Sequence, residues 1–212
     1  MLHSNIPTKI SVNRENIISK HGGVGIKMNF ICDIFEKLEQ LGGEVKAWRD
    51  GKIVFTKKKE YYDFILNLDI FIFELYSILD YFALEMGGII KLKKKLKNKT
   101  VDIEHFTDLK QKALNLDPKI RQKVNAFEKQ PWFRYFHKMR NRITHRLPIG
   151  LRALVYGETI EFPLLPDDPL DPPSVSLKKL DPLTECKKWL EGIFKFIDDI
   201  CFHLGRELFD TF

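Results

Sequence analysis

The residues whose types and spacing could do chemistry gather in one stretch of this chain, residues 132–148. Two histidines in this stretch are interspersed with arginines, a lysine, an asparagine and a threonine. A guanidinium stays protonated and can grip two oxygens of a phosphate, and an imidazole exchanges protons near neutral pH. The stretch therefore indicates a site for a phosphate ester.

A single helix of about four turns is expected to hold these residues. Pro131 suits a first helical position, and Pro148 with Gly150 ends the helix because the residue before a proline is pushed out of the α region. One narrow face of the helix is apolar and should meet the core, and it consists of Trp132, Phe136, Met139, Ile143 and Leu147. The polar face carries, in angular order, Arg140, Thr144, His137, Asn141, Arg134, His145 and Lys138.

The run Arg-Asn-Arg-Ile-Thr-His at residues 140–145 resembles the signature of the HEPN superfamily. In that signature an Arg, often followed directly by a polar residue such as Asn, precedes a His by four to six intervening residues. The resemblance implies an α-helical, usually dimeric domain, which in many members is a metal-independent ribonuclease and in others binds only nucleotides or RNA. The expected order of helices around the motif is also similar to that of the stand-alone bacterial members.

Under this resemblance, His145 would transfer protons, Arg140 would stabilise negative charge on the phosphorane, and Asn141 would hold a phosphate oxygen or orient a neighbour. Residues 76–81 resemble the helix that packs beside the motif in HEPN members, which makes Asp80 a candidate polar partner. Asp80 could equally lie on the solvated edge of a thick helix.

The motif helix is expected to contact RNA through Arg134, His137, Lys138, Arg142, Thr144 and Arg146. A competing interpretation is that Arg and His near a helix C-terminus only stabilise the helix dipole and contact solvent. A metal site built from His137, His145 and acids of the preceding long helix is disfavoured, because no two ligands lie four residues apart on one helix. No metal and no cofactor are therefore expected.

One histidine cannot easily act as base and acid at once, so the resemblance implies a homodimer that brings a second motif across a two-fold axis. The expected function is an endoribonuclease that cleaves RNA by attack of the 2′-hydroxyl, in a toxin or defence role with an antitoxin partner protein by analogy with the family. The alternative is a non-catalytic dimeric helical module that binds RNA, a nucleotide or a partner protein.

The composition sets the broader frame. A chain of 212 residues with 44% hydrophobic content can bury one core, and a net charge of +6 favours polyanionic partners. Three separated cysteines without a Cys-x-x-Cys pair predict a reduced, cytoplasmic protein. No signal peptide is expected at the start of the chain, and the acids in residues 61–86 argue against a membrane span.

The predicted fold is mainly all-α, a single domain over residues 1–212 with five to six bundled helices and one or two short β-hairpins. Residues 1–26 are expected to be an extended lead-in, and residues 163–182 a proline-rich loop. The Lys-rich run at residues 91–99 is more typical of a solvated loop or helix end than of a nucleic-acid contact. Besides the motif helix, the expected helices span about 30–41, 56–86, 102–115, 117–129 and 181–209, with hairpins within 45–55 and 151–165.

Overall fold

The computed structural model describes residues 7–43, 47–49, 52–55, 58–93, 103, 105–112, 118–145, 154–156, 159–163, 165–166 and 179–209. The chain folds into two compact units. Unit 1 combines Met1–Leu75 with Tyr135–Lys187, and unit 2 combines Tyr76–Arg134 with Lys188–Phe212.

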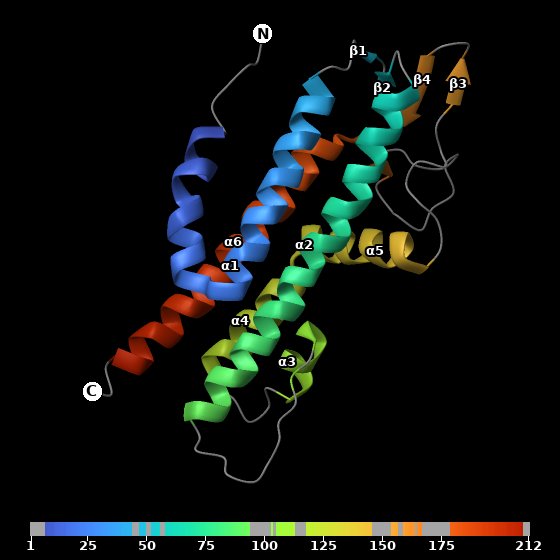
Figure 1. The fold of residues 1–212 in the computed structure, drawn as a ribbon. Coiled ribbons are helices and arrows are strands. Elements are labelled where there is room, and N and C mark those ends of the chain that lie inside the picture. The colour runs from blue at the N-terminus through green and yellow to red at the C-terminus, as the bar shows by residue number, and fades with distance from the viewer. Residues whose placement is uncertain are drawn as a thin grey trace. The chain divides into compact units, whose positions relative to one another are not determined.

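Helices make up most of the described part of the chain, as the sequence predicts (Figure 1). Prolines begin four of them, because the fixed φ of proline suits the first helical turn and its missing N–H has no partner there. The helices are α1 (Pro7–Gly43), α2 (Lys58–Lys93), α3 (Phe106–Lys112), α4 (Pro118–Glu128), α5 (Pro131–His145) and α6 (Pro182–Phe209). Within the described ranges, every helix is too short or too polar to cross a bilayer.

The first helix corrects the prediction of an extended lead-in over residues 1–26. Helix α1 begins at Pro7 and continues to Gly43, through the glycine run at residues 22–25. Once the later part of a helix has formed, the nucleation cost is already met and each added residue gains one backbone hydrogen bond, so a segment without an apolar stripe can continue the helix. In Figure 1 the helix changes direction between its dark-blue first part and its lighter second part, as glycine-rich helices often do.

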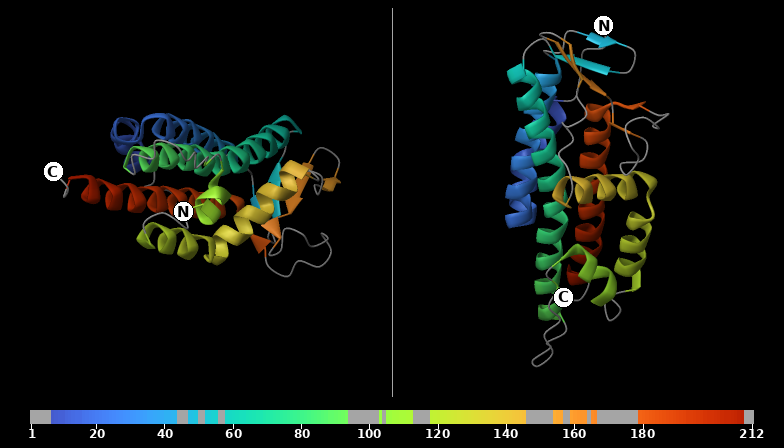
Figure 2. Two further views of the ribbon diagram at one scale, coloured as in Figure 1. Left: turned by 90° about the horizontal axis from the view of Figure 1, so that it is seen from below. Right: turned by 90° about the vertical axis from the view of Figure 1, so that its right-hand side faces the viewer.

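Unit 1 has its core between α1 and the first half of α2, which lie side by side in Figures 1 and 2. The rings of Phe35 and Phe71 lie 5.7 Å apart. An ion pair joins Lys27 of α1 to Glu74 of α2. At the far end of α1, Gly42 packs against Leu183 of α6, and an added Cβ there would lie 2.5 Å from a Leu183 methyl.

Strands in unit 1 join into one sheet rather than forming separate hairpin insertions. The four-stranded sheet has the order β1-β2-β4-β3, and the central pairing of β2 with β4 places Ile53 opposite Phe162. A two-stranded pair, β5 with β6, closes the ends of the predicted proline-rich loop, whose residues 167–178 lie outside the described part. The strands are β1 (Ala47–Arg49), β2 (Lys52–Phe55), β3 (Leu154–Tyr156), β4 (Thr159–Pro163), β5 (Leu165–Pro166) and β6 (Lys179–Leu180).

Unit 2 is built around an aromatic cluster centred on Phe127 of α4. Its ring stacks on Phe196 of α6 with centroids 4.0 Å apart and lies 4.3 Å from Phe133. The ring of Phe106 meets both Phe127 and Phe196 edge-on at 5.9 Å. These contacts hold α3, α4 and the later part of α6 together, because aromatic pairs in such geometries stabilise a core beyond the area they bury.

One side of the second helix is exposed although its sequence is apolar nearly all round. Four large apolar side chains in the first half of α2 are exposed: Tyr62 by 63%, Leu66 by 58%, Ile70 by 36% and Phe73 by 45%. Their spacing of four, four and three residues puts them on one face, and Tyr81 and Leu84 extend the same spacing later in the helix. We call these residues of the first half the exposed α2 stripe.

Candidate functional site

The motif helix is α5, and its buried side chains fix which face is available. Phe136 and Met139 are buried as the predicted stripe requires, and Phe133, which was not assigned to the stripe, is buried too. Trp132 and Ile143 are only half-buried. The apolar face of α5 is therefore wider than the predicted stripe, and the polar residues lie on the remaining side of the helix.

A chain of side-chain hydrogen bonds links three residues of the motif helix. The Arg140 Nη1 donates to the Asn141 Oδ1 at 3.1 Å. The Asn141 Nδ2 lies 3.3 Å from the Nε2 of His137, one helical turn earlier. Asn141 thus connects the guanidinium to an imidazole, and the spacing of four residues between His137 and Asn141 was the sequence signal for this pairing.

The orientation of the Asn141 amide and the hydrogen-bonding role of the His137 ring follow from these contacts. A guanidinium has only donors, so the Asn141 side chain must turn its oxygen to Arg140 and its NH₂ group to His137. The Nε2 of His137 must then accept, which places the ring proton on Nδ1. In this arrangement His137 helps to orient the Asn141 amide.

The other polar residues of α5 differ in exposure. Arg134 and Lys138 are exposed, Arg142 is half-buried, and the Nε of Arg140 is buried. The Thr144 hydroxyl donates to the Arg140 carbonyl oxygen at 2.8 Å, so it satisfies the backbone of the last turn. The backbone of His145 belongs to α5, whereas its side chain and all of Arg146 lie outside the described residues.

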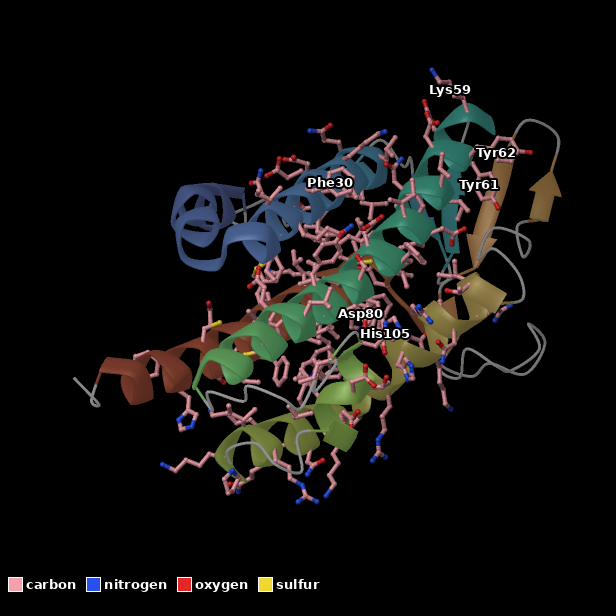
Figure 3. The ribbon with its side chains drawn as sticks, turned by 60° about the horizontal axis from the view of Figure 1, so that its bottom comes forward. Phe30, Lys59, Tyr61, Tyr62, Asp80 and His105 are labelled. Atoms are coloured by element: carbon pink, nitrogen blue, oxygen red, sulfur yellow. The ribbon has the colours of Figure 1, made fainter. Side chains whose placement is uncertain are left out.

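Asp80 has clear contacts within unit 2. Its Oδ1 accepts a hydrogen bond from the backbone N–H of Phe106 at 2.8 Å and lies 3.9 Å from the Nδ1 of His105 (Figure 3). Phe106 is the first residue of α3, where backbone N–H groups have no partner inside the helix. Asp80 therefore caps α3, and its partnership with the motif helix stays a prediction.

Burial displaces the pKa values of two cysteines and a tyrosine outside the motif. Burial raises the pKa of the Cys186 thiol well above its usual value and that of Cys201 to about 11, with Asp198 as a further cause at Cys201. Burial likewise raises the pKa of Tyr61 to about 12. These shifts oppose thiolate formation, so neither cysteine has the environment of a nucleophile.

The described residues contain no group of three or more His, Cys, Asp or Glu side chains arranged to hold a metal ion. The chain matches no protein-family model, no curated protein and no solved structure.

Proposed function

We propose that this protein is a HEPN-like endoribonuclease that cleaves RNA without a metal ion, with the motif at residues 140–145 as its reacting centre. The observation that supports this proposal best is the hydrogen-bonded chain from Arg140 through Asn141 to His137. A guanidinium held in one orientation on a rigid helix suits a phosphate whose charge grows during the reaction. Asn141 is assigned a positioning role, because both ends of its amide are engaged by neighbours.

In the proposed reaction the 2′-oxygen of a ribose attacks the adjacent phosphorus, and the bond from phosphorus to the 5′-oxygen breaks. His145 accepts the proton of the 2′-hydroxyl, and Arg140 binds the non-bridging oxygens as they gain negative charge. The departing 5′-oxygen takes a proton from His145 of a second copy of the chain. The products are a 2′,3′-cyclic phosphate and a free 5′-hydroxyl, so atoms and charge balance.

A homodimer is part of this proposal, and the exposed α2 stripe is the surface that we assign to it. Four large apolar side chains in a row on one helix face are costly to leave in water. A second copy would cover them with the same face, as two-fold symmetry requires. A dimer interface on this side of α2 would account for the apolar side chains that a single copy of the chain leaves exposed.

The second candidate is a module that binds RNA on the same face without cleaving it. The exposure of Arg134 and Lys138 favours this function, because long basic side chains in water can neutralise phosphates of a backbone. The two candidates share a binding face and differ only in turnover.

The deciding experiment incubates a 5′-labelled single-stranded RNA with the protein in the presence of a chelator. The expected result is cleavage to 2′,3′-cyclic phosphate ends, with DNA of the same sequence intact. His145→Ala and Arg140→Ala should each abolish cleavage, and Arg140→Lys should restore little, because an ammonium lacks the two-pronged geometry. Arg121→Ala, which removes an exposed charge from α4, is the matched control and should cleave normally.

Two results would decide against the enzyme. Cleavage that persists in the Arg140→Ala, His145→Ala double variant would come from another source. Retained RNA binding by the parent without any cleavage would establish the binding module instead. Binding itself should weaken, and become less sensitive to salt, when Arg134, Lys138, Arg142 and Arg146 are all neutralised.

A further inference from the structure

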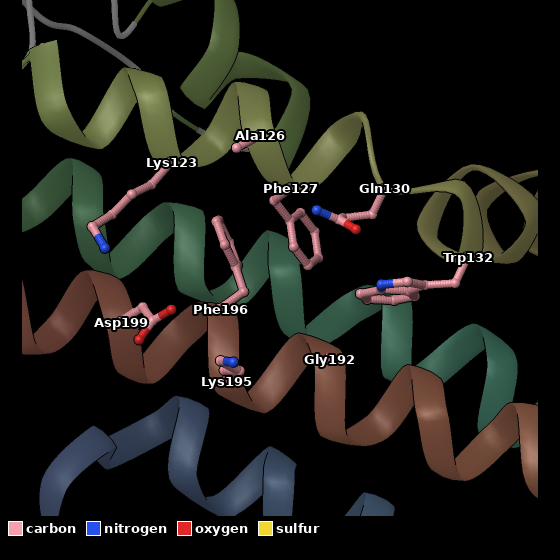
Figure 4. A pocket seen from close by; sticks show the side chains of 9 residues that line it. All are labelled: Lys123, Ala126, Phe127, Gln130, Trp132, Gly192, Lys195, Phe196 and Asp199. Carbon is pink, nitrogen blue, oxygen red and sulfur yellow. The ribbon is translucent and has the colours of Figure 1, made fainter.

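Unit 2 contains a cavity of about 340 Å³ between α4, the start of α5 and α6 (Figure 4). None of the motif residues lines it. Its walls come from three segments that are far apart in the sequence, around residues 123–127, 130–132 and 192–199. Its volume is near the lower end for small-molecule sites, which gives room for about one nucleotide and not for a dinucleotide.

Aromatic side chains line part of the cavity. Phe127 and Phe196 both belong to this lining and stack on each other. Trp132 meets Phe127 edge-on at 5.5 Å and is only half-buried. The indole stands directly over Gly192, where any Cβ would lie 2.4 Å from the ring. Gly192 therefore provides the space that lets the Trp132 indole approach α6 closely.

Polar groups occupy the rest of the lining. In Figure 4, Lys123 extends from α4 toward Asp199 of α6 at one end of the cavity, and Trp132 with Gln130 lies at the other. Lys195 of α6 adds a second ammonium group. The described residues include no ion pair for Lys123 or Lys195, so the two cations and one carboxylate leave the cavity with a net positive charge.

We propose that this cavity binds a ribonucleotide unit, with its base on Trp132 and its phosphate at Lys123 and Lys195. An indole provides a flat surface on which any base can stack, and the Gln130 amide can donate to or accept from a base edge. Lysine ammonium groups suit a phosphate as point charges. Asp199 suits the sugar, because a carboxylate accepts hydrogen bonds from ribose hydroxyls.

This inference goes beyond the proposed cleavage and does not depend on it. The ligand is either a free mononucleotide or one unit of single-stranded RNA, since both have the same chemistry. All binding measurements use the full-length Arg140→Ala variant, in which the proposed cleavage is absent and bound RNA stays intact. Loss of cleavage and loss of binding in the cavity are thereby separate outcomes.

The experiment titrates adenosine monophosphate into this protein and follows tryptophan fluorescence, with calorimetry as a second readout. A saturable change is expected, and Trp132→Phe should remove most of the fluorescence change because Trp132 is the tryptophan that lines the cavity. Lys123→Gln and Lys195→Gln should each weaken binding by about ten-fold, and adenosine without phosphate should bind about ten-fold more weakly than the monophosphate. The control Arg121→Gln removes a charge from the same helix, away from the cavity, and should bind like the parent.

A short oligoadenylate that displaces the monophosphate identifies an RNA strand as the source of the ligand, and failure to displace it identifies the free nucleotide. The proposal is overturned if no saturable binding is seen by calorimetry. It is equally overturned if both lysine variants, folded by circular dichroism, bind as tightly as the parent, or if inorganic phosphate alone competes as well as the nucleotide.

Discussion

The Nδ2 of Asn141 donates to the Nε2 of His137 across 3.3 Å, while the oxygen of the same amide accepts from Arg140. Under the proposed function, Asn141 acts on the reaction through Arg140. We expect Asn141→Ala to lower the cleavage rate by about ten-fold, because a factor of this size corresponds to the free energy of about one charge-assisted hydrogen bond. In the Arg140→Ala background the same change should have no further effect on rate, because the residue to be oriented is gone. Single-turnover assays with matched RNA measure both quantities, and additive losses would show that Asn141 contacts the substrate itself.

Substitutions of Asp80 distinguish a role as the cap of α3 from a catalytic role. We expect Asp80→Ala to lower the free energy of unfolding by about 1 kcal/mol, because the first N–H of α3 loses its acceptor. Asp80→Asn keeps an oxygen acceptor and should restore most of that stability. Urea denaturation measures both, and cleavage should survive in each variant at a temperature where it is folded. A folded Asp80→Asn protein without activity would instead support the sequence-based catalytic role.

Gly192 and Trp132 should be coupled in stability. An alanine Cβ at position 192 would collide with the indole, so Gly192→Ala should destabilise the protein by about 1–2 kcal/mol despite the better helix propensity of alanine. In a Trp132→Ala background the same substitution should become neutral or slightly stabilising. The control is Gly42→Ala, where the nearest atom is the end of the flexible Leu183 side chain and the cost should be smaller. Equal costs in both backgrounds would contradict the close approach.

The exposed α2 stripe predicts the oligomeric state. Light scattering should give a dimer at micromolar concentration, and Leu66→Glu or Phe73→Glu should give a monomer, because charges would be buried across the interface. Phe202→Glu is the control, since Phe202 is as exposed but lies on α6. Cleavage should be lost with dimerisation in the two α2 variants. A monomeric parent would sink both the interface and the shared site.

The raised pKa of Cys201 predicts that the stability of the protein depends on pH in the alkaline range. Because folding raises the pKa of the Cys201 thiol to about 11, its contribution to stability is complete below the pKa of the unfolded thiol, 9.0, and is lost as pH rises through about 11. At pH 8 iodoacetamide should alkylate Cys201 about ten-fold more slowly than an unstructured thiol. Cys186, which is fully buried, should react only when the protein unfolds. Mass spectrometry of timed samples distinguishes labelling at Cys201 from labelling at Cys186, and rapid labelling of Cys186 in the native protein would contradict its burial.

The sequence predicts the start of a helix where a proline or a capping residue occurs there. Pro118, Pro131 and Pro182 mark the starts of α4, α5 and α6, and Asp181 caps the last of these through its carboxylate, which accepts from the Leu183 N–H at 3.0 Å. The start of α1 was missed because residues 7–26 have no apolar periodicity of their own. The joining of β2 to β4 was missed because a contact between strands so far apart in the sequence leaves no local pattern.

At the candidate site, too, local features were predictable from the sequence and contacts between distant segments were not. The wheel of α5 placed Arg140, Asn141 and His137 on one face, and a spacing of four residues makes His137 and Asn141 neighbours on the helix surface. The hydrogen bond from Arg140 to Asn141 joins adjacent residues, and helical spacing does not predict it. The cavity lined by Lys123, Trp132 and Lys195 was not predicted, because it depends on how α4, α5 and α6 meet. Spacing within one helix is visible in sequence, whereas a cavity assembled from separate segments is not.

All three passages of the chain between unit 1 and unit 2 fall inside helices: after Leu75 in α2, after Arg134 in α5 and after Lys187 in α6. Each unit is consequently composed of two separate lengths of chain, and no flexible linker marks a boundary between them. No single truncation yields either unit whole, and a protease that cuts only in loops cannot release one from the other as a contiguous fragment. A laboratory attempt to exchange one of the units must therefore splice helices at matched turns.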